Sequence, residues 1–314
     1  MKIITPFVSV IIPNYCHARY LDQRIQSVLN QTYQNFEVII LDDCSPDNGA
    51  SRAVIEKYRS NPHVSHIVYN EKNSGSTFIQ WEKGFNLACG EYIWIAESDD
   101  FCTNDHLQTL VKEVEVNKNI SVAFCQSQYV DANGDLIAPI YPQDKKVEKF
   151  IGLQFIRKHM LYGNAIWNAS SAIFKRSNAL SIDHQYMGFV SAGDRLFWIE
   201  MAEKGDVIFS HSPQNFFRQH DNKVTPIKQL KGITSREDYK IVRYIEKKGF
   251  VSFIESLFVR ETYMKDISNK TLENEEIRIS LLKLWKKYNI FDIGLIQIFC
   301  KIHFKIMKIW ERIV

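Results

Sequence analysis

Long apolar runs alternate with helical patterns through the first hundred residues. The runs at 7–12 and 38–41 are typical of strands covered on both faces, and further strands are predicted at 66–69 and 92–96. Apolar residues recur at helical spacing near 21–29 and 78–88, and a further helix is expected to end near Tyr58. Strands and helices in this alternating order predict a doubly wound, mostly parallel sheet of the α/β class.

Beyond residue 103 the predicted order becomes mixed. We expect helices at 105–117 and 194–204, strands at 122–125, 207–209 and 215–218, an extended segment at 165–175 and a hairpin turn at Asn133-Gly134. From about Pro226 the pattern is helical to the end of the chain. The sequence therefore predicts three parts, at 1–102, 103–225 and 226–314.

The composition is that of a globular protein. Of 314 residues, 45% are hydrophobic and 24% are charged, which argues against disordered and fibrous classes. No run of 18 uninterrupted apolar residues is present, so a membrane-spanning helix is not expected. Six cysteines without a CxxC pair fit reduced thiols in the cytoplasm and argue against a zinc site. The apolar N-terminal stretch lacks a small-residue cleavage site, so it predicts a strand rather than a signal peptide.

Charge is distributed unevenly along the chain. Residues 1–225 carry 21 Lys and Arg against 25 Asp and Glu, a net −4, whereas residues 226–314 carry 18 against 11, a net +7. The acidic body argues against nucleic-acid binding, and the basic extension indicates an anionic surface as its partner.

The segment 290–314 has the pattern of an amphipathic helix. Lys301, Lys305, Lys308 and Arg312 fall on one narrow stripe, and apolar residues that include Trp310 surround it. Such a helix suits an anionic membrane surface, which would place a cytoplasmic protein peripherally on the inner face of the plasma membrane. Docking of the apolar side on the main domain explains the same pattern, and the sequence leaves both interpretations open.

Polar residues follow three of the predicted parallel strands. They are Pro13-Asn14-Tyr15, Asp42-Asp43 and Glu97-Ser98-Asp99-Asp100. One acidic pair alone is more typical of a helix cap or a turn, but three such strand ends lie at the edge where parallel sheets bind ligands. Neither a G-x-G-x-x-G loop after the first strand nor a P-loop is present, so a bound diphosphate would need a cation such as Mg²⁺ or Mn²⁺.

An ordered set of motifs extends this interpretation. It comprises segments 8–15, 36–45, 73–75, Gly84, 88–93 and 97–100. Together they resemble the family 2 glycosyltransferases with the GT-A fold, over roughly residues 7–225. The resemblance implies metal-assisted transfer of a sugar, with inversion, from a nucleotide-diphosphate donor to a hydroxyl of a glycan or lipid-linked glycan, as in polysaccharide biosynthesis for the cell envelope. Residues 1–102 would then bind the nucleotide-sugar, and 103–225 would form the acceptor-binding and catalytic half.

The resemblance also implies roles for individual residues. The donor would be bound by Pro13, Asn14, Tyr15, Asp42, Asn73, Gly75, Glu97, Ser98 and Arg218. Asp99 and His220 would hold Mn²⁺ or Mg²⁺, and Asp194 at the start of a helix would be the catalytic base, although an Asp there is more often an N-cap. Glu97 stands where the family usually has Asp, which puts its contact with the ion in doubt.

Two rival classes remain after this resemblance. Many members carry an Arg-Asn pair where this chain has Gln80-Trp81, which puts one donor contact in doubt, and Trp81 is more typical of core packing. A non-catalytic nucleotide-sugar-binding homologue therefore stays open. A sugar nucleotidyltransferase would carry a Gly-rich loop with Arg and Lys after the first strand, and the segment 14–17 is not such a loop.

Overall fold

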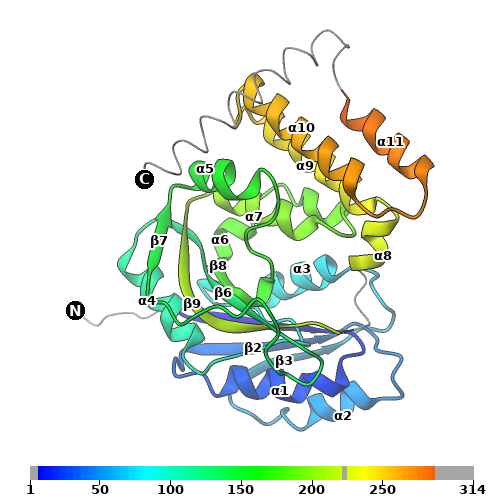
Figure 1. Ribbon diagram of the computed structural model, residues 1–314. Coiled ribbons are helices and arrows are strands. Elements are labelled where there is room, and N and C mark those ends of the chain that lie inside the picture. The colour runs from blue at the N-terminus through cyan, green and yellow to red at the C-terminus, as the bar shows by residue number, and fades with distance from the viewer. Residues whose placement is uncertain (1–5, 221–224, 287–314) are drawn as a thin grey trace. The chain divides into compact units, whose positions relative to one another are not determined.

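The computed structural model describes residues 6–220 and 225–286 (Figure 1). Its described residues fall into two compact units, one within 1–158 and 164–223, the other within 159–163 and 224–314. The three-part division expected at residues 102 and 225 stays a prediction.

The first unit contains one mixed sheet. Its parallel half consists of β3 (Val64–Tyr69), β2 (Phe36–Asp42), β1 (Val8–Asn14) and β4 (Tyr92–Ile95), in that spatial order. β8 (Ala172–Lys175) then lies antiparallel between β4 and β6 (Ile120–Val130), and β9 (Asp206–Arg218) runs parallel to β6. β5 (Phe101–Cys102) and β7 (Val147–Phe150) pair antiparallel with β9. The predicted α/β class, a parallel half followed by a mixed half, is confirmed.

Helices cover both faces of this sheet (Figure 1). α1 (Ala18–Leu29), α2 (Ala50–Glu56) and α4 (His106–Val116) share one apolar cluster with Val8, Val10 and Ile12 of β1. Successive side chains of a strand point to opposite faces. Ile11 therefore points to the other face, where α3 (Thr77–Leu87) packs Gly84 against it. α7 (Gly193–Glu203) joins that face through Phe197, whose ring contacts Phe174 of β8 and Phe85 of α3.

The second half of this unit departs from the sequence-based expectation in three places. The two strands expected at 207–209 and 215–218 are one irregular strand, β9, whose pairing with β6 shifts register around Gln126. The expected extended segment 165–175 contains a 3-10 turn at Ala169–Ser171, because the Asn168 side chain accepts a hydrogen bond from Ser170 N. Further elements were not expected from the sequence: β5, β7, α5 (Gly152–Phe155), a π turn at Ile156–Met160, α6 (Arg176–Ala179) and a 3-10 turn at Gln185–Gly188.

The described part of the second unit is helical, as predicted. It contains α8 (Thr225–Leu230), α9 (Ile233–Lys247), α10 (Phe253–Asn269) and α11 (Glu275–Trp285). A capping box between Ser252 and Glu255 starts α10, and Glu246 of α9 pairs with the buried Arg260 at 2.7 Å. Across residues 6–220 and 225–286, none of the helices combines the length and the apolarity that crossing a membrane requires.

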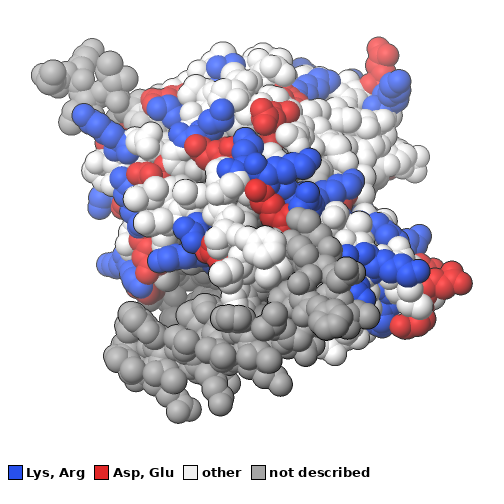
Figure 2. Space-filling view, turned by 90° about the horizontal axis from the view of Figure 1, so that it is seen from above, with Lys and Arg blue, Asp and Glu red and all other residues white. Residues whose placement is uncertain are grey.

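Several basic residues of the second unit form ion pairs with acidic neighbours close in sequence. Ion pairs join Arg243 to Glu246, Lys265 to Glu261, Lys270 to Asp266 and Arg278 to Glu275. Figure 2 shows Lys and Arg interspersed with Asp and Glu on the face that it presents. The predicted basic stripe at 290–314 lies outside the described residues, so its two interpretations remain open.

A small buried polar network joins the parallel strands below the site. Ser9 donates to Glu37 across β1 and β2 at 2.6 Å, and Gly90 N donates to Ser9 at 2.8 Å. A Cβ on Gly90 would lie 2.6 Å from Ser9 N and 2.8 Å from Phe7 O. Because both are backbone atoms, the loop before β4 needs glycine here.

We expect Gly90→Ala to destabilise the protein by about 1–3 kcal/mol, the usual cost of forcing extra volume into a packed site. Gly188→Ala is the matched control, since a Cβ there meets no atom within 4 Å. Chemical denaturation of both variants measures the difference. Equal stability of the two variants would contradict the packing argument.

Candidate functional site

The ends of β1 and β2 bring two predicted donor-binding residues together. Asn14 and Asp42 are register partners, and Asn14 Nδ2 donates to Asp42 Oδ1 at 2.7 Å. Ser45 donates its hydroxyl to Asp42 Oδ1 at 2.7 Å and its backbone N–H to Oδ2 at 3.1 Å. These bonds fix the carboxylate at the strand end. Pro13 is buried within β1, whereas the Tyr15 side chain is 45% exposed beside this pair in the chain.

Asp43 organises the loop that precedes α3. Its carboxylate accepts hydrogen bonds from Asn70, Asn73, Ser74 and Gln80, and Ser74 donates both its backbone N–H and its hydroxyl. The Asn73 side chain also accepts from Gly75 N at 2.7 Å, and Gly75 has the left-handed φ of +76°. The predicted roles of Asn73 and Gly75 in donor binding stay predictions, and the structure places both in a loop held by Asp43.

Glu97 points toward α3. Trp81 is buried among Phe78 and Phe197, as its core-packing interpretation requires, and its Nε1 donates to Glu97 Oε1 at 3.0 Å. Burial, with the negative charge of Asp99 adding to it, raises the pKa of Glu97 to about 8. The side chain is therefore largely protonated at neutral pH. An uncharged carboxyl group can donate a hydrogen bond to a sugar or ribose oxygen.

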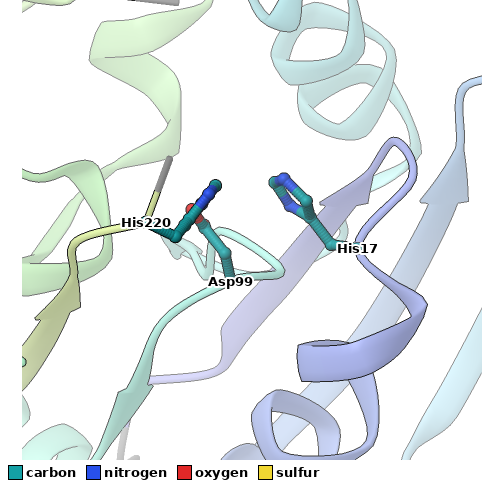
Figure 3. Close-up of side chains that lie close together, drawn as sticks. All are labelled: His17, Asp99 and His220. Atoms are coloured by element: carbon teal, nitrogen blue, oxygen red, sulfur yellow. The ribbon is translucent and has the colours of Figure 1, made fainter. Parts of the chain in front are cut away.

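His17, Asp99 and His220 form a cluster at the ends of three strands (Figure 3). His17 follows β1, Asp99 follows β4 and His220 follows β9, and one ligand atom from each lies within 4.8 Å of the others. His220 Nε2 is 3.1 Å from Asp99 Oδ2. His17 Nδ1 is 2.9 Å from the Ser98 hydroxyl, which leaves Nε2 for a ligand. A polar partner on the second ring nitrogen is the usual arrangement of a metal-binding histidine.

The protonation states in this cluster suit a cation. Burial opposes the charge of Asp99, but its interactions with its neighbours, the hydrogen bond from His220 foremost, outweigh burial, so its pKa is lowered. Burial lowers the pKa of His17 as well, which favours the neutral imidazole that binds metals. Two imidazoles and one ionised carboxylate are a plausible donor set for a divalent ion, with further positions open to substrate oxygens. The cluster contains both predicted ligands, Asp99 and His220, and adds His17.

Arg218 holds the segment that carries Asp99. Its Nε donates to Asp99 O at 2.7 Å, and its other nitrogens donate to the carbonyls of Asp131 and Ala132 and to Gln23 Oε1. The guanidinium also lies over the Tyr20 ring, 4.6 Å from its centroid. The structure thus gives the buried Arg218 a positioning role, and its predicted contact with the donor stays a prediction.

Asp100 also holds the segment that carries Asp99, through hydrogen bonds of its buried carboxylate. It accepts from Asn168 and Ser170 at 2.7 Å each and from Arg218 N at 3.0 Å, and Arg24 lies 3.9 Å away. Burial and the neighbouring charge of Asp99 raise its pKa to about 6. Asp100 therefore faces the protein while Asp99 faces the cluster.

Asp194 lies in the first turn of α7. The N-cap of this helix is Ala192, so Asp194 does not have the capping role that its position in the sequence allowed. Its carboxylate accepts from Asn164 Nδ2 and from Arg195 N, each at 2.8 Å. Burial raises its pKa to about 6. A carboxylate with this pKa is suited to general-base chemistry near neutral pH. The preceding Gly193 has no room for a side chain, because a Cβ would lie 2.5 Å from the Phe78 ring.

Sequence reasoning missed three residues of this site. His17 stands three residues after Asn14, the last residue of β1, and a histidine so close to a strand end was the available signal. Asp43 and Asp100 are the second members of acidic pairs, and the sequence predicted a role only for the first members, Asp42 and Asp99. Their inward direction depends on partners far along the chain, such as Asn73 and Asn168.

Comparison with known proteins agrees with the geometry. Residues 9–179, more than half of the chain, match the family described as Glycosyl transferase family 2. The chain therefore belongs to glycosyltransferase family 2, as the resemblance implied, and it is a glycosyltransferase.

Several glycosyltransferases and one solved structure are similar to this chain. An uncharacterized glycosyltransferase of Methanocaldococcus jannaschii is 28% identical over 230 residues, which cover 72% of this chain and 76% of that protein. The putative teichuronic acid biosynthesis glycosyltransferase TuaG of Bacillus subtilis is 36% identical over 124 residues, 40% of this chain and 47% of its own. A fragment of S. aureus TarS in complex with UDP-GlcNAc aligns with a TM-score of 0.64 at 19% identity, covering 88% of this chain and 80% of that fragment. This likeness supports the GT-A fold.

If His17 is a metal ligand, His17→Ala should weaken Mn²⁺ binding by about tenfold or more, since loss even of a residue that only orients a ligand costs that much. His66→Ala, on β3, is the control and should bind Mn²⁺ like the wild type. Titration calorimetry with Mn²⁺ alone makes the measurement independent of activity. Unchanged affinity in His17→Ala would remove His17 from the donor set.

Proposed function

We propose that this glycosyltransferase moves a sugar from a nucleotide-diphosphate donor to a hydroxyl of a glycan or lipid-linked glycan, with inversion and with help from a divalent cation. The observation that carries the proposal is the convergence of His17, Asp99 and His220 at the strand ends of a family 2 chain. A ligand-binding edge of a parallel sheet is where a nucleotide would sit.

The donor would lie along the ends of β1 and β2. Asn14 and Asp42 form a fixed polar pair there, and the exposed Tyr15 ring offers a stacking surface for a base. Ser98 and the protonated Glu97 supply hydrogen bonds nearer to the cluster. The solved structure of TarS in complex with UDP-GlcNAc makes UDP-GlcNAc the first donor to assay.

His17, Asp99 and His220 would hold the cation. Mn²⁺ suits this set better than Mg²⁺, because Mg²⁺ prefers oxygen ligands and two of the three ligands are imidazoles. When bound, the ion would supply positive charge beside the departing diphosphate. Arg218 and Asp100 keep Asp99 in place for this role through their bonds to the adjacent backbone and to the 168–170 turn.

Asp194 would act as the base in a single displacement. Its carboxylate takes the proton of the acceptor hydroxyl as the hydroxyl oxygen forms a bond to the anomeric carbon. The bond from that carbon to the diphosphate oxygen breaks with its electron pair, and the nucleoside diphosphate leaves from the opposite face. Asn164 orients the carboxylate by its hydrogen bond to Oδ2.

The acceptor is proposed to belong to a cell-envelope polysaccharide. Support comes from the name of TuaG, which assigns that relative to teichuronic acid biosynthesis. Peripheral binding at the inner face of the plasma membrane through 290–314 belongs to the same proposal, because a lipid-linked acceptor would bring the substrate there.

Asp99→Asn should lower transfer from UDP-GlcNAc by about 10²-fold or more, because it removes the charge of a ligand and almost none of its volume. Asp135→Asn, an exposed change of the same kind, should leave the rate unchanged. Donor turnover at low Mn²⁺ measures both. Near wild-type turnover in Asp99→Asn would overturn the metal assignment, and an inert wild type would favour a non-catalytic homologue.

Asp194→Asn should lower turnover by about 10²–10⁴-fold, the usual contribution of a general base. Donor affinity should change little. In the wild type, protonation of Asp194 should make the rate fall as the pH drops below about 6, near its raised pKa, and the rate should be level from there up to about pH 8, where Glu97 loses its proton. Loss of donor binding together with turnover would instead assign Asp194 to the donor site.

A further inference from the structure

We propose that Trp167, with Tyr129 and Tyr141 beside it, forms a platform on which a pyranose ring of the acceptor stacks. This inference rests on the proposed function and names a binding site for its second substrate.

Trp167 differs from the other tryptophans of the described chain. Trp81, Trp94, Trp198 and Trp285 are at most 2% exposed, whereas the Trp167 side chain is 46% exposed. Its ring stacks on Tyr129 with centroids 6.1 Å apart and an interplanar angle of 22°, and Tyr141 lies 6.4 Å away. Three aromatic rings thus gather at the surface around the only exposed tryptophan among residues 6–220 and 225–286.

Residues beside Trp167 in the chain form hydrogen bonds both to the proposed base and to the acidic end of β4. Three residues earlier, Asn164 donates to the carboxylate of the proposed base, Asp194. One residue later, Asn168 donates to Asp100, and Ser170 donates to the same carboxylate and accepts from Glu97 N. The platform therefore lies in a segment whose neighbours contact the base on one side and the acidic strand end on the other.

The strands β6 and β9 determine the face of the sheet on which the platform lies. Asn215 of β9 donates to Ser127 of β6 and to Asn168, so these polar side chains share one face of the two strands. Side chains two residues apart point to the same face, which places Tyr129 and Phe217 there as well. Their rings pack 5.7 Å apart. The Tyr129 ring therefore supports Trp167 on the face that carries the hydrogen bonds to Asp100.

The chemistry of the platform favours a sugar. A pyranose presents a flat set of C–H groups on one face and hydroxyl groups at its rim, so an exposed indole offers a flat apolar surface that matches it. Tyr129 holds the indole in a stacked geometry, which limits the entropy lost on binding. Tyr141 is itself tied to β6, because its backbone N–H and carbonyl both bond to the Gln128 side chain.

The test combines tryptophan fluorescence with calorimetry. Chitotetraose and cellotetraose serve as pyranose probes, and ribitol serves as an open-chain polyol. We expect a pyranose oligomer at millimolar concentration to change the emission of the wild type, and ribitol to leave it unchanged. The change should vanish in Trp167→Phe, because the other described tryptophans are buried.

Calorimetry then measures the binding of the oligomer independently of the fluorescence of Trp167. Trp167→Phe should bind the oligomer within a few-fold of the wild type, whereas Trp167→Ala should bind it about tenfold or more weakly. Affinity for UDP-GlcNAc with Mn²⁺ should be the same in all three proteins. Phe253→Ala, a change at an exposed aromatic residue of the second unit, is the control and should keep oligomer binding.

The outcomes distinguish this inference from the proposed function. Normal donor binding with no response to either oligomer, or equal oligomer affinity in Trp167→Ala, overturns the platform alone. A fluorescence change that persists in Trp167→Phe also overturns it. Failure of the wild type to bind any nucleotide-sugar overturns the proposed function itself.

Discussion

The buried carboxylate of Asp100 is the constraint on which the rest of the site depends. It joins three pieces of backbone that are distant in sequence: the end of β4, the turn at 168–170 and the end of β9. An unpartnered charge at this depth would cost several kcal/mol, so the site can exist only if these partners arrive together. Once these hydrogen bonds form, the backbone on either side holds Asp99 and His220 next to each other.

The two acidic pairs of the site share one local arrangement. In Asp42-Asp43 and in Asp99-Asp100, consecutive side chains at a strand end point in different directions. In the first pair Asn14 and Ser45 hold Asp42, whereas the loop residues Asn70, Asn73, Ser74 and Gln80 hold Asp43. In the second pair Asp99 lies in the histidine cluster, whereas Asn168 and Ser170 hold Asp100. The pairing of acids thus serves the loop architecture as much as the chemistry. Gln80, which departs from the family pattern, is one of the residues that Asp43 anchors.

The parallel half of the sheet was predictable because local patterns determine it. Continuous apolar runs identified β1, β2 and β4, and polar strand ends indicated the candidate site with Asn14, Asp42 and Asp99. What could not be predicted depends on long-range contacts. The turn at Ala169–Ser171 needs the Asn168 cap, the continuity of β9 needs a partner with shifted register, and the inclusion of His17 needs the approach of His220, 203 residues later. The periodicity of apolar residues indicates local secondary structure and gives no information about partners so distant in the sequence.

An ion bound to His17, Asp99 and His220 would affect folding as well as catalysis. These residues come from near the beginning, the middle and the end of the first unit, so an ion bound to all three would act as a non-covalent cross-link over most of its length. A ligand that binds only the folded chain stabilises it in proportion to the logarithm of its concentration above the dissociation constant. The supply of the metal would then affect both the rate of sugar transfer and the free energy of unfolding of the enzyme.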